Sequence, residues 1–177
     1  TNNSIWVLLE VESISPLAPL HNPAALKGIR AFMDAIPKAL NVACFDTAFH
    51  QTMDESTYLY PVPYEWYVKY DVRKYGFHDL SHKFITEQMT DILAKVPNLI
   101  ICHIGSGSSI ACVKDGKCYD TTMGLTPLDG LMMGTRTGSI DPSIIEYIMK
   151  ETGKDANEVV NDLNKKFFAE LGKATLK

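Results

Sequence analysis

The sequence predicts an α/β fold with a mixed sheet and a β-hairpin whose turn is suited to binding phosphate. Short apolar runs of strand length alternate with amphipathic stretches of helix length along the 177 residues. Three of these runs follow one another between residues 99 and 121, separated by turns that contain glycine. The hydrophobic share of 46% is enough for a buried core in a chain of this length, so we do not expect disorder.

The first part of the chain is expected to hold two strands with a helix between them. Residues 5–9 form a strand-like apolar run, and residues 41–45 have the composition of a short buried strand. Between them, Asn22-Pro23 offers an N-cap and a first-turn proline for a helix to about Met33. Because ligands collect at the carboxyl ends of strands in open α/β sheets, the polar residues 46–52 are candidates for a site.

The rest of the chain is expected to alternate between helices and the three-stranded segment. Residues 58–75, rich in tyrosine and proline, are expected to pack on the surface and lead into a short helix. Asp115-Gly116 predicts a two-residue hairpin turn, and Asp155 with Glu158 has the spacing of a capping box. The remaining predicted elements are helices near 81–95, 142–151 and 156–171, and strands at 99–104, 110–114 and 117–121.

Charge and hydropathy favour a small-molecule partner. The formal charge is −4, from 17 basic and 21 acidic residues without long like-charge runs, which argues against nucleic acid or a membrane surface as partner. The longest apolar stretches are too short to cross a bilayer, and the first residues lack the basic and apolar regions of a signal peptide. We therefore expect a cytoplasmic protein.

Neither the cysteines nor the histidines predict a metal site. The four cysteines form no C-x-x-C pair and lie in apolar or alternating segments, so buried reduced thiols are expected. His78 and His82 are four residues apart and would share one helix face. They lack the glutamate of a H-E-x-x-H motif and a third ligand, so we expect no metal ligand among them.

The turn at Gly105–Ser109 is the first candidate for binding chemistry. Consecutive backbone N–H groups hold phosphate well where side chains are small and φ is free, as glycine and serine allow. No Gly-Lys-Ser/Thr follows, and the third glycine and following helix of a dinucleotide loop are missing. The residues thus fit a strand-turn-strand phosphate cradle, and an ordinary hairpin turn remains the alternative.

Charged and imidazole side chains elsewhere could complete a phosphoryl-transfer site. Arg136 lies between Gly134 and Gly138, and its planar guanidinium suits phosphoryl oxygens. Asp46 follows an apolar run and could orient a nucleophile, hold a metal-bound water, or simply cap the next turn. His21, His78 and His103 could each donate to developing negative charge or be ordinary structural residues; the histidines, Asp46 and Arg136 together fit phosphoryl transfer, in which positioning and electrostatics dominate.

Five motifs in this order closely resemble the acetate kinase family. They are LAPLHNP at residues 17–23, FDTAFHQTM at 45–53, YGFH at 75–78, HIGSGSS at 103–109 and MMGTRTG at 132–138. The resemblance implies the fold shared by acetate and sugar kinases, Hsp70 and actin (ribonuclease H-like), with ATP bound between two related domains. Residues 1–48 would then be the remainder of the first domain, and residues 49–177 the first half of the second, ATP-binding domain, leaving the fold incomplete.

The resemblance also implies an activity and roles for single residues. The family transfers the γ-phosphoryl group of ATP reversibly to acetate in a Mg²⁺-dependent reaction that gives acetyl phosphate and ADP, and a homodimer is expected. Asp46 would be the catalytic acidic residue, His78 and Arg136 would stabilise the transition state, and His21 would lie near the transferred phosphoryl. The ATP phosphate loop would comprise His103, Ile104, Gly105, Ser106 and Gly107. Propionate or butyrate remains an alternative acceptor.

Some family features have no counterpart in this sequence. These are the Asn-x-Gly-Ser-Ser-Ser phosphate loop, the substrate-binding arginine, the adenosine-binding loops and a Mg²⁺-binding glutamate. Asp79 also stands where the family usually has glycine, and its carboxylate would repel the transferring phosphate. We therefore expect a partial enzyme that turns over poorly alone, with a non-catalytic remnant or excised module that binds ATP weakly or not at all as the alternative.

Overall fold

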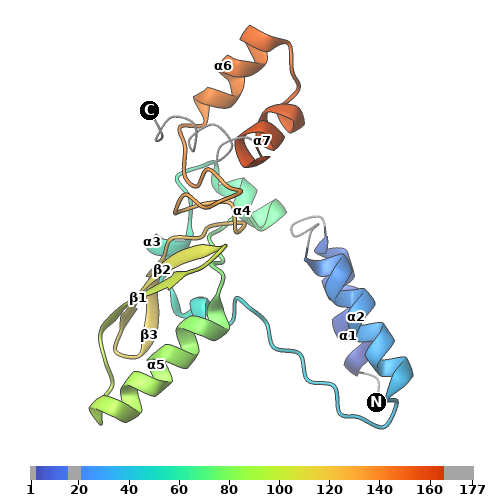
Figure 1. The fold of residues 1–177 in the computed structure, drawn as a ribbon, viewed down its shortest axis with the longest axis vertical. Coiled ribbons are helices and arrows are strands. Elements are labelled where there is room, and N and C mark those ends of the chain that lie inside the picture. Colours follow the sequence, from blue (N-terminus) through green and yellow to red (C-terminus); the bar gives the residue numbers. More distant parts are fainter. Residues whose placement is uncertain (1–2, 16–20, 166–177) are drawn as a thin grey trace. The chain divides into compact units, whose positions relative to one another are not determined.

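The computed structural model describes residues 3–15 and 21–165 (Figure 1). Residues 17–20 of the first motif and residues 166–171 of the last predicted helix lie outside the described residues. The chain divides into two compact units, Thr1–Cys44 and Phe45–Lys177, each of which is described by itself. The assignment of residues 1–48 and 49–177 to two kinase domains remains a prediction.

The first unit contains two helices in contact, α1 (Asn3–Ser13) and α2 (Asn22–Ala35). The helix predicted from Asn22 is confirmed, with His21 rather than Asn22 as its N-cap. The strand expected at residues 5–9 is wrong, because these residues belong to α1. A short apolar run has the same periodicity in a buried strand and in a helix, and here Leu8 and Val11, three residues apart, are the half-buried positions of one helix face.

The strand expected at residues 41–45 is also not formed. Residues 40–45 are irregular and exposed, and among the described residues no strand pairs with them. A strand needs a neighbour for its backbone N–H and C=O groups, which is why β-branched and aromatic composition alone does not create one. The polar residues that follow, from Asp46 onward, belong to the second unit.

The second unit is built on an antiparallel sheet of three strands in the order β1-β2-β3. The strands are β1 (Leu99–Ile104), β2 (Ser108–Lys114) and β3 (Lys117–Thr121), which confirms the three predicted runs. Asp115 and Gly116 connect β2 to β3 with φ of 50° and 73°, the left-handed geometry that a two-residue hairpin turn requires. Of the mixed sheet that was expected, the described residues form this antiparallel part.

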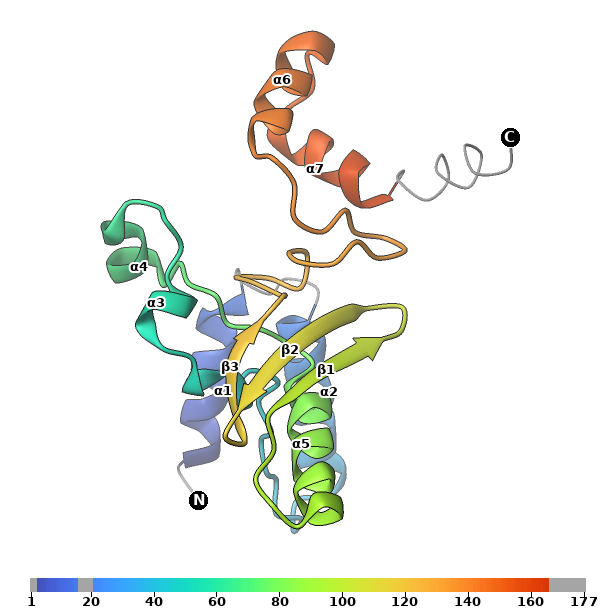
Figure 2. The same cartoon turned by 90° about the vertical axis from the view of Figure 1, so that its left-hand side faces the viewer.

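One face of this sheet is covered by helices. The helix α5 (Asp79–Leu93) packs against β1, and the 3-10 helix η2 (Phe49–Thr52) packs against β3 and α5 (Figure 2). The short helices α3 (Glu55–Tyr58) and α4 (Tyr64–Tyr70) follow η2 in the chain, and α4 lies within the aromatic segment 58–75 rather than after it. The side chains buried between this face of the sheet and the helices α5 and η2 include both apolar and polar groups, namely Ile101, Ala111, Val113, Cys118, His50, His82 and Ser109.

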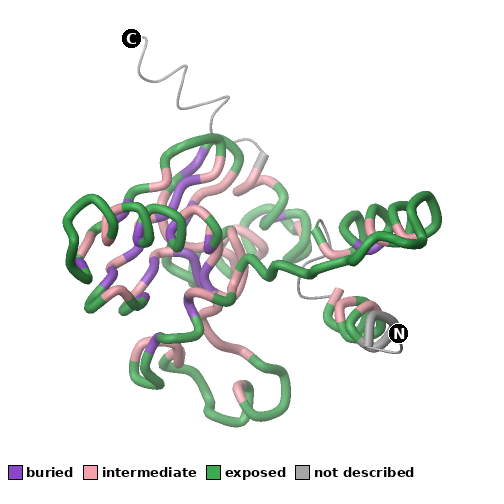
Figure 3. Tube along the Cα trace, turned by 90° about the horizontal axis from the view of Figure 1, so that it is seen from below, coloured by how far each residue is buried: buried purple, intermediate pink, exposed green. Residues whose placement is uncertain are grey.

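The opposite face of the sheet is open along β1. Ile100 and Ile104 alternate with the buried Ile101 along β1, and their exposed fractions are 67% and 70% against 7%. Figure 3 colours the chain by burial and shows buried, intermediate and exposed stretches succeeding one another along it. Exposure that alternates from one residue to the next is expected along a strand when a single face of the sheet is covered.

The chain continues after the sheet through a long loop into α6 (Ser143–Thr152) and α7 (Ala156–Lys165), which contact each other. The predicted capping box is confirmed: Glu158 N donates to Asp155 Oδ1 and Asp155 N donates to Glu158 Oε2, both at 2.9 Å. Among the helices of residues 3–15 and 21–165, none is long and apolar enough to cross a membrane. The four cysteines are free, but Cys44 and Cys102 are exposed, so their predicted burial is wrong: Cys44 lies in the irregular segment and Cys102 on the open sheet face.

Candidate functional site

The β1-β2 turn is tighter than the sequence indicated. Ile104 pairs with Ser108, so that only Gly105, Ser106 and Gly107 lie in the loop, and Ser108 and Ser109 belong to β2. Gly105 N donates to Gly107 O at 3.0 Å, which closes the turn. The loop carries no side chain larger than serine, and Gly105 and Ser106 are exposed. A bound anion could therefore approach the backbone of this loop closely.

Gly107 lies where two predicted site residues meet. A Cβ atom at this position would be 3.1 Å from His78 Nε2 and 3.7 Å from Arg136 Nη1. His78 and Arg136 each lie 29 residues from Gly107 in the sequence, one before it and one after it. The fold thus brings an imidazole and a guanidinium to the same loop. Only glycine leaves the space between this imidazole and this guanidinium free, and that space borders the predicted phosphate loop.

His78 is held at the start of α5 by its backbone. It is the N-cap of the helix and has φ of 59°, a left-handed conformation that is uncommon for a residue with a side chain. Its Nδ1 contacts Ser109 Oγ at 2.9 Å, which leaves Nε2 directed at Gly107. Burial, then the charge of the nearby His103, lower the pKa of His78, so the ring is neutral at physiological pH.

Asp46 caps the same helix end. Its Oδ2 accepts a hydrogen bond from His78 N at 3.2 Å, and its Oδ1 accepts one from Leu80 N at 3.4 Å. The first N–H groups of a helix have no partner within the helix and attract negative charge, so the carboxylate stabilises α5 and the backbone of His78 together. Asp46 thus caps a helix that begins more than 30 residues further along the chain, whereas the sequence suggested a cap of the next turn, and the side chain is also exposed beside His78.

His103 completes one side of the site from β1. Its ring stacks on that of His78 with centroids 4.0 Å apart and planes inclined by 21°. Its Nδ1 contacts Ser81 Oγ of α5 at 2.9 Å, which fixes the ring orientation and keeps Nε2 near the loop at Gly105. Ile104, in contrast, points to the open face of the sheet and contributes only its backbone to the loop.

Arg136 is presented by a tight turn of the long loop. Met133 and Arg136 pair across Gly134 and Thr135, and Met133 N donates to Arg136 O at 2.9 Å. The guanidinium Nη1 donates to Pro127 O at 2.9 Å, which orients the group on the side facing Gly107. The side chain is half-buried, so a fixed positive charge borders the candidate phosphate site.

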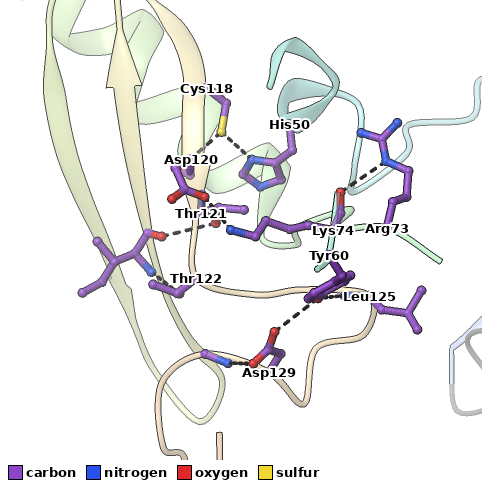
Figure 4. Close-up of polar contacts among 12 residues, drawn as sticks. His50, Tyr60, Arg73, Lys74, Cys118, Asp120, Thr121, Thr122, Leu125 and Asp129 are labelled. Atoms are coloured by element: carbon purple, nitrogen blue, oxygen red, sulfur yellow. Dashed lines mark hydrogen bonds and ion pairs between the residues drawn. The ribbon is translucent and has the colours of Figure 1, made fainter. Parts of the chain in front are cut away.

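A separate polar cluster anchors the loop that carries Arg136 (Figure 4). Tyr60 OH accepts a hydrogen bond from Leu125 N at 2.8 Å and donates one to Asp129 Oδ2 at 3.3 Å. Asp129 Oδ1 in turn accepts from Ser139 Oγ at 2.6 Å. Burial raises the pKa of Tyr60 to about 12, so its hydroxyl stays protonated and can donate to Asp129.

Two polar residues behind the site were not predicted as site residues. Ser109 and His82 are fully buried, and His82 Nε2 lies 2.8 Å from Ser109 Oγ. The sequence contained both signals, because Ser109 belongs to the fourth motif and His82 follows His78 by one helical turn. The latter spacing indicates a shared helix face, and no group of three metal-binding side chains occurs in the part of the chain that the structure describes.

Asp79 does not face the loop as expected. Its carboxylate is buried and accepts a hydrogen bond from Phe49 N of η2. Burial raises the pKa of Asp79, which also reduces its tendency to carry charge. The carboxylate of Asp79 is therefore not directed at a phosphate beside His78, and the predicted repulsion does not arise from this geometry. Asp79 instead connects α5 to η2.

His21 belongs to the first unit and lies at the N-cap of α2, where its side chain is exposed and makes no capping hydrogen bond. Its role near a transferred phosphoryl group remains a prediction. The residues that the structure brings together in the second unit are Asp46, His78, His103, Gly105, Gly107 and Arg136.

Comparison with known proteins identifies relatives of this arrangement. The sequence matches the Acetokinase family over residues 5–169. It is 59% identical over 152 residues to an acetate kinase of Mesoplasma florum, covering 84% of this chain and 38% of that protein. It is 58% identical over 160 residues to an acetate kinase of Bacillus subtilis, covering 89% and 40%. The chain thus spans about two fifths of the length of these relatives.

Solved structures agree with the sequence comparison. A propionate kinase from Francisella tularensis superimposes with a TM-score of 0.87 at 49% identity, covering 94% of this chain and 43% of that one. An acetate kinase from Porphyromonas gingivalis gives 0.85 at 44% identity, covering 94% and 42%. These neighbours confirm the predicted acetate and sugar kinase/Hsp70/actin-like fold as an incomplete copy. Because the family match extends over most of its residues, the chain belongs to the Acetokinase family.

Proposed function

We propose that this chain carries the phosphoryl-transfer centre of an acetate kinase. The proposed reaction is reversible, Mg²⁺-dependent transfer of the γ-phosphoryl group of ATP to acetate, which gives acetyl phosphate and ADP. The observation that carries the proposal is the meeting of His78 Nε2 and Arg136 Nη1 at the space kept free by Gly107. Two donors at one glycine turn suit the dispersed negative charge of a phosphoryl group in transfer.

The chemistry needs positioning rather than a strong base. The carboxylate of acetate is already a nucleophile, so no proton has to be removed before attack on phosphorus. Arg136 would neutralise the charge on the equatorial oxygens, and the neutral ring of His78 would donate one hydrogen bond to them. Asp46 would hold the backbone of His78 in place through its helix cap while its exposed edge faces the reacting groups.

The residues present fit the phosphates of ATP better than they fit a free metal ion. The loop of residues 105–107 offers a small, exposed backbone turn, whereas Asp46 is the one acidic side chain that the described part of the chain places at the site, and both its oxygens already accept hydrogen bonds. Mg²⁺ in kinases is held by one or two carboxylates together with substrate phosphates. When bound with ATP, Mg²⁺ would supply charge neutralisation, and Asp46 would be the carboxylate that helps to hold it.

The finer parts of the proposal follow from the family. The acceptor is proposed to be acetate, with propionate as an alternative because a structural neighbour is named a propionate kinase. His21, Ile104 and Ser106 retain their proposed places around the phosphates, and cytoplasmic location and a homodimer are proposed for the whole protein. Poor turnover is expected of the chain alone, because it spans about two fifths of its relatives.

Calorimetry and an acetyl phosphate assay test the proposal together. We expect the purified chain to bind ATP with Mg²⁺ measurably and Arg136→Ala to weaken that binding, while acetyl phosphate forms slowly or not at all. Asp46→Asn separates two functions, because the amide oxygen can still accept one of the helix-capping hydrogen bonds while the charge is lost. Robust acetyl phosphate formation by the chain, abolished in Arg136→Ala, would overturn the expectation of poor turnover.

A non-catalytic module of the same fold is the second candidate. The observation that favours it is the engagement of both Asp46 oxygens in capping α5, which is a structural use of the proposed catalytic acid. In that case ATP with Mg²⁺ should produce no heat of binding. Asp46→Asn should then change only the stability of the chain.

A further inference from the structure

Ser109 joins two histidine rings beneath the candidate site. Its Oγ lies 2.9 Å from Nδ1 of His78 and 2.8 Å from Nε2 of His82. Ser109 and His82 are fully buried, and Ser109 is in β2 whereas both histidines lie at the first turns of α5. A hydroxyl has one proton, so it can donate to only one of these nitrogens and must accept from the other.

The far nitrogen of His82 decides the direction of this chain of hydrogen bonds. His82 Nδ1 is buried and has no hydrogen-bond partner among the residues that the structure describes. Burial lowers the pKa of His82 to about 4, so the ring is neutral and carries one N–H. A proton on Nδ1 would leave a buried donor unpaired, which is rarer and costlier than an unused acceptor lone pair. The proton therefore belongs on Nε2, which donates to Ser109.

The direction of the hydrogen bond from His82 also fixes the direction of the hydrogen bond between Ser109 and His78. If His82 donates to Ser109, the hydroxyl proton of Ser109 points to Nδ1 of His78. A neutral His78 that accepts at Nδ1 carries its own proton on Nε2, the atom that faces Gly107. We propose that His82 and Ser109 are positioning residues that hold His78 as the Nε2–H tautomer and so aim its one donor at the phosphoryl site.

The proposal rests on the proposed function only for what that donor would contact. In the opposite tautomer, Nε2 of His78 would present a lone pair to the phosphate oxygens and would repel them. A buried serine and histidine would thus decide whether the half-buried His78 attracts or repels the anion. The sequence spacing of His78 and His82, one helical turn apart, is what lets a single hydroxyl reach both rings.

The tautomer can be measured without turnover. The full chain, labelled with ¹⁵N in histidine, is studied by long-range ¹H-¹⁵N correlation at about pH 8, where histidines are neutral. Signals are assigned with His78→Asn and His82→Gln spectra. We expect His78 to show a protonated Nε2 and an unprotonated Nδ1, and His82 to show the same. A His78 ring protonated on Nδ1 would overturn the proposal.

Variants separate positioning from packing. Ser109→Ala removes the donor to His78 and should convert its single-tautomer pattern into a mixture of the two. His82→Gln retains an amide donor toward Ser109 and should preserve the pattern, whereas His82→Leu should lose it. Ser108→Ala is the matched control, because that neighbouring hydroxyl donates to Gly105 O and contacts neither ring. An unchanged His78 pattern in both Ser109→Ala and His82→Leu would contradict the proposal.

Failure of this inference and failure of the proposed function have different readouts. If the tautomer pattern is as expected but ATP with Mg²⁺ does not bind, the hydrogen bonds from His82 through Ser109 to His78 exist in a module that does not use them. If ATP binds and His78 is protonated on Nδ1, the proposed function stands and the proposed hydrogen-bond direction is wrong.

Discussion

The two faces of the β1-β2-β3 sheet differ in what covers them. Beneath α5 and η2, the face with Ile101 and Val113 is tightly buried and also contains the polar Ser109, which contacts His82 of α5. On the other face Ile100 and Ile104 alternate with them and are about two thirds exposed. The helix-covered face therefore contributes both to the stability of the unit and to the positioning of the candidate site. Apolar composition alone does not distinguish the two faces.

The largest loss of stability on the helix-covered face is expected for Gly76→Ala. Gly76 has φ of +75°, and a Cβ there would lie 2.6 Å from Thr121 Cγ2 and 2.7 Å from His50 Cδ2. Left-handed backbone costs about 1–2 kcal/mol and overpacking about 1–3 kcal/mol, so we expect a loss of roughly 2–5 kcal/mol. Urea unfolding followed by circular dichroism measures it. Gly134→Ala, with open space around its Cβ, should change the free energy by less than about 0.5 kcal/mol.

Neighbouring isoleucines compare the two faces directly. Ile101→Ala removes a buried side chain and should lower the free energy of unfolding by about 3 kcal/mol. Ile100→Ala removes an exposed one from the same strand and should change it by less than about 0.5 kcal/mol. Chemical denaturation of both variants decides the matter. Equal losses would show that the open face is covered in solution.

The pH dependence of stability tests the buried histidine. Burial gives His82 a folded pKa of about 4 against 6.5 unfolded, so the unfolded chain binds more protons between these values. Stability contributed by neutral burial should be fully present above pH 6.5 and decline as pH falls to 4, by on the order of 3 kcal/mol. Unfolding free energies of the parent and His82→Gln, measured across this window, should differ in slope. Parallel curves would contradict the buried neutral ring.

The smallest expected effect concerns the rim of the helix-covered face at the hairpin. Gly107→Ala places a methyl group 3.1 Å from His78 Nε2 and should weaken ATP binding about tenfold, or about 1.4 kcal/mol. Gly28→Ala is the control, because a Cβ at Gly28 would meet no atom within 4 Å and the residue belongs to the first unit. Calorimetry with ATP and Mg²⁺ compares the two variants. Equal affinities would remove Gly107 from the site.

The sequence predicted elements well where a signal was local. The Asp115-Gly116 turn and the Asp155 and Glu158 capping box each depend on a few adjacent residues, and both are confirmed. It failed at residues 5–9 and 41–45, because short apolar runs have no preference of their own between helix, strand and irregular chain. The exposure of Cys102 was missed for a similar reason, since the pattern of β1 does not say which face a helix covers.

By itself the sequence determined the family, through five motifs whose order and length are specific, and it named Asp46, His78, His103, Gly107 and Arg136 as candidates. Only the tertiary structure decided how these residues meet: Asp46 caps the helix that begins at His78, and Arg136 reaches Gly107 across 29 residues of chain. It also decided that Ser109 and His82 stand behind His78. The reason is physical, because the direction of a hydrogen bond between buried rings depends on distances and burial, which residue order does not contain.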